Sequence, residues 1–279
     1  MTNPPLAVEE SSEAAVLDPS GEPERRAGAV DTHCHLFLME QEPAVVAAEA
    51  RAVGVERLVC VGVDAASSRR SLELAESIEG VFATAGVHPH DASTFDRDAG
   101  STVEELLANP LVIGVGETGL DYYRRLSPAE DQQRAFRTHI ALARESGKPL
   151  VVHVREAWPD ALRILEEERA EAVVLHCFSG DEDIALEASA RGYFLSLSAN
   201  ITYPGADAIR AAASAAPEDR LLVETDSPFL PPQSMRGERN SPTHVRDVVE
   251  TLANLRGLDF DLMVRRTGEN ARRAFPLLR

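Results

Sequence analysis

The chain has 279 residues and a formal net charge of −18, from 46 acidic and 28 basic side chains. This balance excludes a protein that holds nucleic acid through a global positive field, so a polyanionic substrate must be bound by local charge such as a metal centre and a few arginines. No apolar stretch reaches the roughly 20 residues of a membrane span, and the N-terminal residues lack the basic and apolar regions of a secretory signal. We therefore expect a cytoplasmic protein without membrane contact.

Residues 1–28 are rich in Pro, Glu, Ser and Ala and have no periodic apolar face, which predicts a disordered tail. From residue 29 onward, short apolar runs alternate with longer segments of helical periodicity. The apolar runs comprise residues 29–36, 57–64, 81–88, 111–117, 149–154, 172–178, 193–200 and 221–226. The clearest helical segments comprise residues 42–53, 127–145, 157–168 and 243–255, followed by a last helix at 259–275.

Nearly continuous apolar strands followed by helices are typical of a parallel sheet covered by helices. Eight such units between residues 29 and 279 predict a single α/β domain, a (β/α)8 TIM barrel. A doubly wound open sheet is the alternative, but the sequence lacks the Gly-x-Gly-x-x-Gly turn expected there. Ser127, Pro128 and Glu130 predict a capped start for the helix over 127–145.

The first apolar run contains Asp31-Thr32-His33-Cys34-His35. Residues two apart on a strand share a face, so His33, His35 and Asp31 are expected to point the same way. Two adjacent imidazoles make a good pair of metal ligands, although two surface histidines in a turn would look the same. The three cysteines, Cys34 among them, lie in apolar runs and are expected to be reduced and buried.

Polar side chains also end the later runs: His88, Glu117, His153 with Arg155, His176, and Asp226. In a barrel these carboxyl-terminal strand ends form the mouth, where sites are built. Taken singly, each residue has a structural explanation, such as a buried hydrogen-bonded histidine or a helix cap. Four histidines and two carboxylates converging on one rim instead suit two divalent ions with mixed nitrogen and oxygen ligands. Gly116 and Gly119 are expected to leave room for close approach at the mouth.

Here the sequence resembles the TatD-type metal-dependent deoxyribonucleases, within the amidohydrolase-like metal-dependent hydrolases. The resemblance covers about residues 29 to 275. It rests on Asp31-Thr32-His33-Cys34-His35-Leu36, Gly86-Val87-His88-Pro89-His90, Gly116-Glu117-Thr118-Gly119-Leu120-Asp121-Tyr122-Tyr123, His153-Val154-Arg155-Glu156-Ala157, His176-Cys177-Phe178-Ser179-Gly180, Glu224-Thr225-Asp226-Ser227-Pro228-Phe229-Leu230 and Arg236-Gly237-Glu238-Arg239-Asn240-Ser241-Pro242. The resemblance implies a barrel hydrolase with two divalent ions, in which His33, His35 and Asp226 hold one ion. It assigns His153 and His176 to the other ion and makes Glu117 the bridge.

The resulting hypothesis is hydrolysis of phosphodiester bonds in DNA, by exonuclease action on single-stranded ends. Two ions share a water and lower its pKa, and the hydroxide attacks phosphorus while Asp226 accepts a proton. Mg2+, Mn2+ and Zn2+ all remain candidates. No obligate protein partner is evident from the sequence.

The candidate substrate contacts are less specific than the ligands. His88 is expected to touch the substrate or to orient a ligand. Arg155 is expected to grip a phosphate, with an ion pair at the rim as the alternative. Tyr122 either stacks a base or covers the next helix. Arg236 and Asn240 lie in the last loop, a usual phosphate-binding place in barrels.

Two other readings of the sequence remain open. The first is an ester or amide hydrolase on the same barrel, such as an aminoacyl-tRNA deacylase. Lys148 is the only lysine and precedes the fifth strand, which places it at the opposite rim. A bridging lysine is thereby disfavoured, but a glutamate-bridged ester hydrolase is not. The second is a catalytically idle barrel that binds metal, against which the intact ligand set argues.

Overall fold

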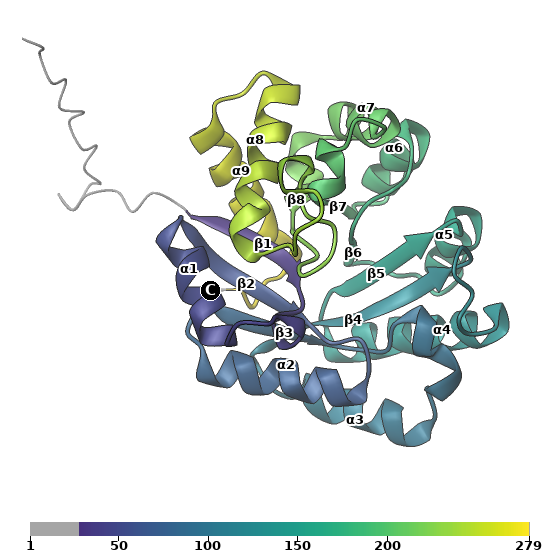
Figure 1. Ribbon diagram of the computed structural model, residues 1–279. Helices are drawn as coiled ribbons and strands as arrows, with labels where there is room; N and C mark the ends of the chain where they lie inside the picture. Colours follow the sequence, from purple (N-terminus) through teal and green to yellow (C-terminus); the bar gives the residue numbers. More distant parts are fainter. Residues whose placement is uncertain (1–27, 279) are drawn as a thin grey trace, which may run out of the picture.

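The computed structural model describes residues 28–278 and shows eight parallel strands in the order β1 to β8, with helices outside them (Figure 1). The strands are β1 Ala29–Cys34, β2 Val55–Val61, β3 Val81–Ala85, β4 Val112–Asp121, β5 Leu150–Arg155, β6 Val173–Leu175, β7 Phe194–Leu197 and β8 Leu221–Val223. The predicted (β/α)8 barrel is confirmed. The predicted tail lies outside the described residues except for Gly28, and no helix within residues 28–278 is long and apolar enough to cross a membrane.

The helices alternate with the strands along the chain. They are α1 Pro43–Ala52, α2 Ala65–Ser77, α3 Arg97–Leu107, α4 Ala129–Ser146, α5 Trp158–Glu167, α6 Glu182–Ala190, α7 Asp207–Ala215, α8 Val245–Arg256 and α9 Phe260–Ala274. Short 3-10 helices are η1 Leu36–Leu38, η2 Pro89–Thr94, η3 Ala199–Thr202, η4 Glu218–Arg220, η5 Gln233–Met235 and η6 Pro242–His244. The predicted helices are all present, with ends that differ by one or two residues.

The start of α4 differs from the prediction in its chemistry. The helix begins at Ala129 with Pro128 at the cap position, and no side chain caps it. Ser127 is buried instead, and its hydroxyl donates to the carbonyl of His90 at 2.7 Å. The predicted serine cap is therefore wrong, because the hydroxyl is used to tie the loop after β4 to the loop after β3.

One end of the barrel interior is apolar and sealed by α9. Each of the strands except β7 contributes a buried side chain to a cluster that also includes Ala271 and Ala274 of α9 and the next residue, Phe275, which has no exposed surface. The strand members are Val30, Val59, Val61, Phe82, Ile113, Val151, Val174 and Leu222. Figure 1 shows α9 beside β1 and β8, so the last helix closes the barrel where the first and last strands meet.

Side chains hold much of the seam between β1 and β8. Beyond a single bridge between Cys34 and Ser227, the Thr32 hydroxyl donates to the Val223 carbonyl at 2.9 Å. The buried carboxylate of Asp31 accepts from the Thr225 amide at 2.9 Å and from its hydroxyl at 2.6 Å. Asp31 therefore bonds to the segment after β8 and does not join His33 and His35 as a third ligand.

Candidate metal centre

Six residues predicted as ligands meet at the carboxyl-terminal end of the barrel. His33, His35, Glu117 and His176 are buried, and His153 and Asp226 are partly exposed. His88 joins the same cluster. The strands β6 and β8 end before His176 and Asp226, so these two side chains come from the loops that immediately follow.

One half of the cluster is a triangle of ligand-type atoms. Glu117 Oε1 lies 3.0 Å from His176 Nε2 and 3.1 Å from His153 Nδ1, and the two nitrogens are 3.4 Å apart. Ligands at about 2.0–2.2 Å from one ion stand roughly 3.0–3.5 Å from each other in tetrahedral or octahedral geometry. The triangle therefore fits one face of the coordination shell of a single divalent ion.

The other half of the cluster faces the second oxygen of Glu117. His33 Nε2 lies 3.4 Å from Glu117 Oε2 and 3.9 Å from Asp226 Oδ1, while His35 Nε2 lies 3.4 Å from Asp226 Oδ1. Both ring nitrogens of His33 are buried without a hydrogen-bond partner. Buried polar atoms are rarely left unpaired, so this imidazole fits a cation ligand better than a structural histidine.

Two of the histidine rings are oriented by hydrogen bonds from the ring nitrogen that faces away from the cluster. His35 Nδ1 donates to the Val61 carbonyl at 2.8 Å. His176 Nδ1 donates to Glu224 Oε1 at 2.9 Å, and the same oxygen accepts the Cys177 amide. Such partners set the tautomer of a metal-binding histidine. Glu224 has no predicted role in the sequence analysis, and its place two residues before Asp226 is the available signal.

Asp121 is the second residue that sequence reasoning missed. It ends β4, is buried, and lies 3.5 Å from His153 Nε2 and 2.8 Å from His90 Nε2. Although burial opposes ionisation, bonds from His153, His90 and the Arg124 amide hold the pKa of Asp121 below its usual range. An ionised Asp121 behind His153 leaves Nδ1 as the nitrogen facing Glu117.

The cluster stabilises charge on Glu117. Burial alone raises the pKa of this carboxyl, but His176, His88 and His33 outweigh burial and hold the pKa well below its usual range. Burial likewise opposes a charge on His176, yet Glu117 and Glu224 raise its pKa well above the ordinary value. Burial and the neighbouring His176 lower the pKa of His33. A divalent ion supplies the positive charge that the carboxylates attract.

Two residues at the centre have left-handed backbones. Asp226 has φ of 56° and Cys177 has φ of 43°. Such non-glycine residues are uncommon and cluster at functional sites. The Asp226 amide donates to the His33 carbonyl at 2.9 Å, which holds the residue against β1.

Cys34 and Cys60 are buried free thiols as expected, whereas Cys177 is only partly buried and follows β6, with its sulfur 3.2 Å from Ser198 Oγ.

Two exposed arginines each lie near a tyrosine, and both tyrosines belong to loops that follow strands. The Arg155 guanidinium lies 4.0 Å from the ring centre of Tyr123, and that of Arg236 lies 4.7 Å from Tyr203. Tyr122 is engaged elsewhere: its hydroxyl donates to Asp160 at 3.0 Å and accepts from Gln133 at 2.8 Å. The structure thus favours the second interpretation of Tyr122, as cover for the next helix.

Asn240 is not available to a substrate, which corrects the sequence-based expectation. It is buried, and its Nδ2 donates to the carbonyls of Thr225, Phe229 and Leu230. Its Oδ1 accepts from the Ser241 amide and faces His244 Nδ1 at 2.9 Å. All of its bonding capacity therefore holds the loop between β8 and α8.

The glycines beside Glu117 serve packing between strands. Gly116 and Gly119 have φ of 135° and 133°, and a Cβ would stand 2.4 Å from the Val151 carbonyl oxygen and 2.1 Å from that of His153. They leave room for a close approach, as expected, and the group that approaches is the backbone of β5. Lys148 lies at the opposite rim as expected, where Nζ donates to the carbonyls of Asn109 and Val112.

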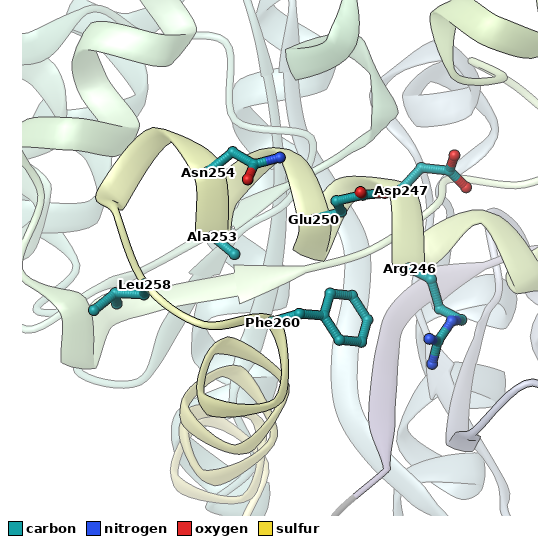
Figure 2. A pocket seen from close by; sticks show the side chains of 7 residues that line it. All are labelled: Arg246, Asp247, Glu250, Ala253, Asn254, Leu258 and Phe260. Carbon is teal, nitrogen blue, oxygen red and sulfur yellow. The ribbon is translucent and has the colours of Figure 1, made fainter. Parts of the chain in front are cut away.

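Two hollows of the molecule lie away from the ligand cluster. A hollow of about 340 Å³ lies between α8 and α9, lined by Arg246, Asp247, Glu250, Ala253, Asn254, Leu258 and Phe260 (Figure 2). Another of about 370 Å³ lies beside α3 and α4. Neither hollow includes a residue that the sequence singled out, so the ligand chemistry identifies the site.

A (β/α)8 barrel with this ligand set at its mouth defines a metal-dependent hydrolase. A family model described as TatD related DNase matches residues 30–276. The chain belongs to the TatD-related DNase family.

Individual relatives agree with this assignment. The uncharacterized metal-dependent hydrolase YabD of Bacillus subtilis is 39% identical over 249 residues, covering 88% of this chain and 98% of YabD. The 3'-5' ssDNA/RNA exonuclease TatD of Musicola paradisiaca is 36% identical over 250 residues, covering 85% and 93%. The crystal structure of the TatD homolog YJJV from Escherichia coli has a TM-score of 0.85 at 26% identity, covering 90% of this chain and 99% of that chain.

Proposed function

We infer that the chain hydrolyses phosphodiester bonds in DNA, as an exonuclease that acts on single-stranded ends with two divalent ions. The observation that carries this inference is the position of Glu117, whose two oxygens face two separate groups of imidazoles. Relatives named 3'-5' ssDNA/RNA exonuclease, 35–36% identical to this chain, support the substrate class.

The distances support a division of the ligands between two ions. His33, His35 and Asp226 would hold one ion, and His153 and His176 the other, with Glu117 between them. Bound ions of the Mg2+, Mn2+ or Zn2+ type lower the pKa of a water molecule and offset charge on phosphoryl oxygens.

Asp226 is placed to accept the proton of the attacking water. Burial alone raises its pKa, but the bond to His35 and the nearby His176 and His33 outweigh burial and lower it. The carboxylate is therefore ionised near neutral pH and partly exposed at the mouth. These are the properties that a general base needs.

Substrate binding depends on local positive charge, because the net charge of −18 repels a polyanion at long range. Arg155, the last residue of β5, and Arg236, in the loop after β8, are both exposed at the mouth, where a guanidinium can grip a phosphate with two parallel hydrogen bonds. Tyr123, beside Arg155 and 57% exposed, is a better base-stacking surface than Tyr122.

The test compares wild-type protein with Glu117→Ala on end-labelled single-stranded DNA, with Mg2+, Mn2+ or chelator. Glu269→Ala, an exposed glutamate on α9, is the matched control. We expect metal-dependent shortening from one end in the wild type and control, and none in Glu117→Ala. Turnover of aminoacyl-tRNA or a small ester without DNA cleavage would instead indicate the ester hydrolase. No turnover of any of these substrates would indicate an idle barrel.

A further inference from the structure

The hydrogen bond made by one ring nitrogen of a histidine determines what the other nitrogen can do. A carbonyl oxygen can only accept, so the bond from His35 Nδ1 to Val61 places the proton on Nδ1. Glu224 Oε1, which also accepts the Cys177 amide, is the acceptor for Nδ1–H of His176. When each ring is neutral, its Nε2 carries the lone pair and faces the cluster, as a metal ligand must.

His88 has the opposite arrangement. Its Nδ1 accepts the backbone N–H of His90 at 3.1 Å, and a backbone N–H can only donate. Nδ1 therefore carries no proton, and the proton of the neutral ring is on Nε2. That nitrogen faces the cluster, 3.3 Å from Glu117 Oε1. His88 presents an N–H where His35 and His176 present lone pairs.

The loop that carries His88 is fixed on both sides. The His88 amide donates to the Val63 carbonyl at 2.8 Å, and the Val87 amide donates to His139 Nε2 at 3.0 Å. His90 is held through its ring by Asp121 and through its carbonyl by Ser127. A flip of the His88 ring would leave the His90 amide without its acceptor, which disfavours the alternative orientation.

Ligand distance alone would permit another interpretation. Ligand-type atoms of His88, Glu117 and His153 lie within 4.8 Å of one another, a spacing that an ion could bridge. The proton on Nε2 excludes His88 from such a site while its bond to the His90 amide holds. Glu117 Oε1 has a further lone pair beside the one that faces His153 and His176, and an N–H donor suits it.

We propose that His88 is a positioning residue that donates its Nε2–H to Glu117 Oε1 and keeps this oxygen directed at the ion held by His153 and His176. The proposal rests on the two-ion site proposed above. Because Oε2 faces the other group, loss of the donor weakens the ion at His153 and His176 more than the ion at His33, His35 and Asp226.

The first test follows Mn2+ binding by electron paramagnetic resonance in wild type, His88→Gln and His88→Ala. A glutamine amide can replace the Nε2–H donor, whereas alanine cannot. We expect His88→Gln to bind both ions within about threefold of wild type and His88→Ala to bind one ion about 10–100-fold more weakly. Equal losses in both variants would indicate a ligand, and unchanged binding in both would indicate no role; either result overturns the proposal.

The second test uses the wild-type chain and needs no substrate. Two-bond 15N spectra of the histidine rings, with His88 assigned by its loss in His88→Gln, report which nitrogen carries the proton. We expect a protonated Nε2 on His88 with and without Zn2+, and no coupling between His88 and 113Cd. A His88–cadmium coupling would overturn the proposal even if His88→Ala did not fold.

These readouts separate the proposal from the proposed function. Normal metal binding and the expected His88 tautomer without DNA cleavage would remove the nuclease and leave His88 as a positioning residue. Binding of one ion only would remove the two-ion site and, with it, the role of His88.

Discussion

The two ends of the barrel interior are built from the same strands but have opposite chemistry. On β5, Val151 belongs to the apolar cluster and His153 to the metal centre, two residues further on. Val174 and His176 follow the same pattern along β6 and the loop after it. Residues two apart share a face of a strand. A step of two residues along each strand therefore leads from the packed apolar layer to the layer of ligands.

One end of the barrel therefore contributes mainly to stability, and the other end holds the groups for chemistry. The apolar end buries Phe275 among aliphatic side chains of the strands. The ligand end holds buried atoms without hydrogen-bond partners, among them both nitrogens of His33 and Glu224 Oε2. Unpaired buried polar groups cost free energy. We therefore expect the ligand end to depend on ions and pH, and the apolar end to depend on packing.

Removal of the ions is expected to have the largest effect. Ions at about 100 times their dissociation constant stabilise the folded state by about 2.7 kcal/mol each, or roughly 5 kcal/mol for two. Because His33 lies on the first strand and Asp226 on the loop that follows the last strand, chelation should loosen that seam. A thermal scan with and without chelator measures the effect. An unchanged melting temperature, with metal loss confirmed, would contradict this linkage.

Phe275→Ala tests the apolar end. We expect the free energy of unfolding to fall by about 3–5 kcal/mol, because the substitution leaves a cavity beneath the strands. Urea unfolding measures the change, and metal stoichiometry in the folded variant should stay at the wild-type value. Phe229→Ala is the matched control, since Phe229 is 51% exposed at the opposite end. A loss of bound metal in Phe275→Ala would show that the two ends are coupled.

His139 tests pH dependence away from the ligands. It is fully buried between Ala135 and Val87, and burial lowers its pKa from 6.5 to about 4. The unfolded chain therefore binds a proton at a higher pH than the folded chain, and the stabilising contribution is present above pH 6.5. It is lost as the pH falls towards 4, by roughly 3 kcal/mol for a shift of this size.

The measurement is the free energy of unfolding of wild type minus that of His139→Gln, from pH 7 to pH 4 in chelator. Other titrating groups cancel in this difference. We expect the wild type to lose stability relative to the variant over this window. A difference independent of pH would show that His139 does not titrate on unfolding.

Arg155→Ala is expected to have the smallest effect. If the guanidinium grips a phosphate remote from the reacting bond, its loss removes binding shared by substrate and transition state. KM on single-stranded DNA should rise about fivefold to tenfold, or about 1 kcal/mol, with kcat within twofold. Arg163→Ala, an exposed arginine on α5, is the control. A fall in kcat with KM unchanged would place Arg155 in the chemical step.

Local patterns in the sequence suffice to predict the barrel and the residues at its mouth. The apolar runs identify the strands because a strand covered by helices must be apolar on both faces. The strand ends then identify His33, Glu117, His153 and His176, because parallel strands of a barrel deliver their ends to one rim. These inferences need only local patterns and the closure of the barrel.

The contacts of each side chain depend instead on which distant segments the fold brings together. Asn240 lies in a loop typical of phosphate binding, yet three backbone carbonyls occupy its amide. Gly116 makes room for Val151 on β5, a contact without a local signature. Asp121 and Glu224 decide which nitrogens of His153 and His176 face Glu117. Those partners come from other strands and loops, and hydrogen bonds between distant segments form only when the chain is folded.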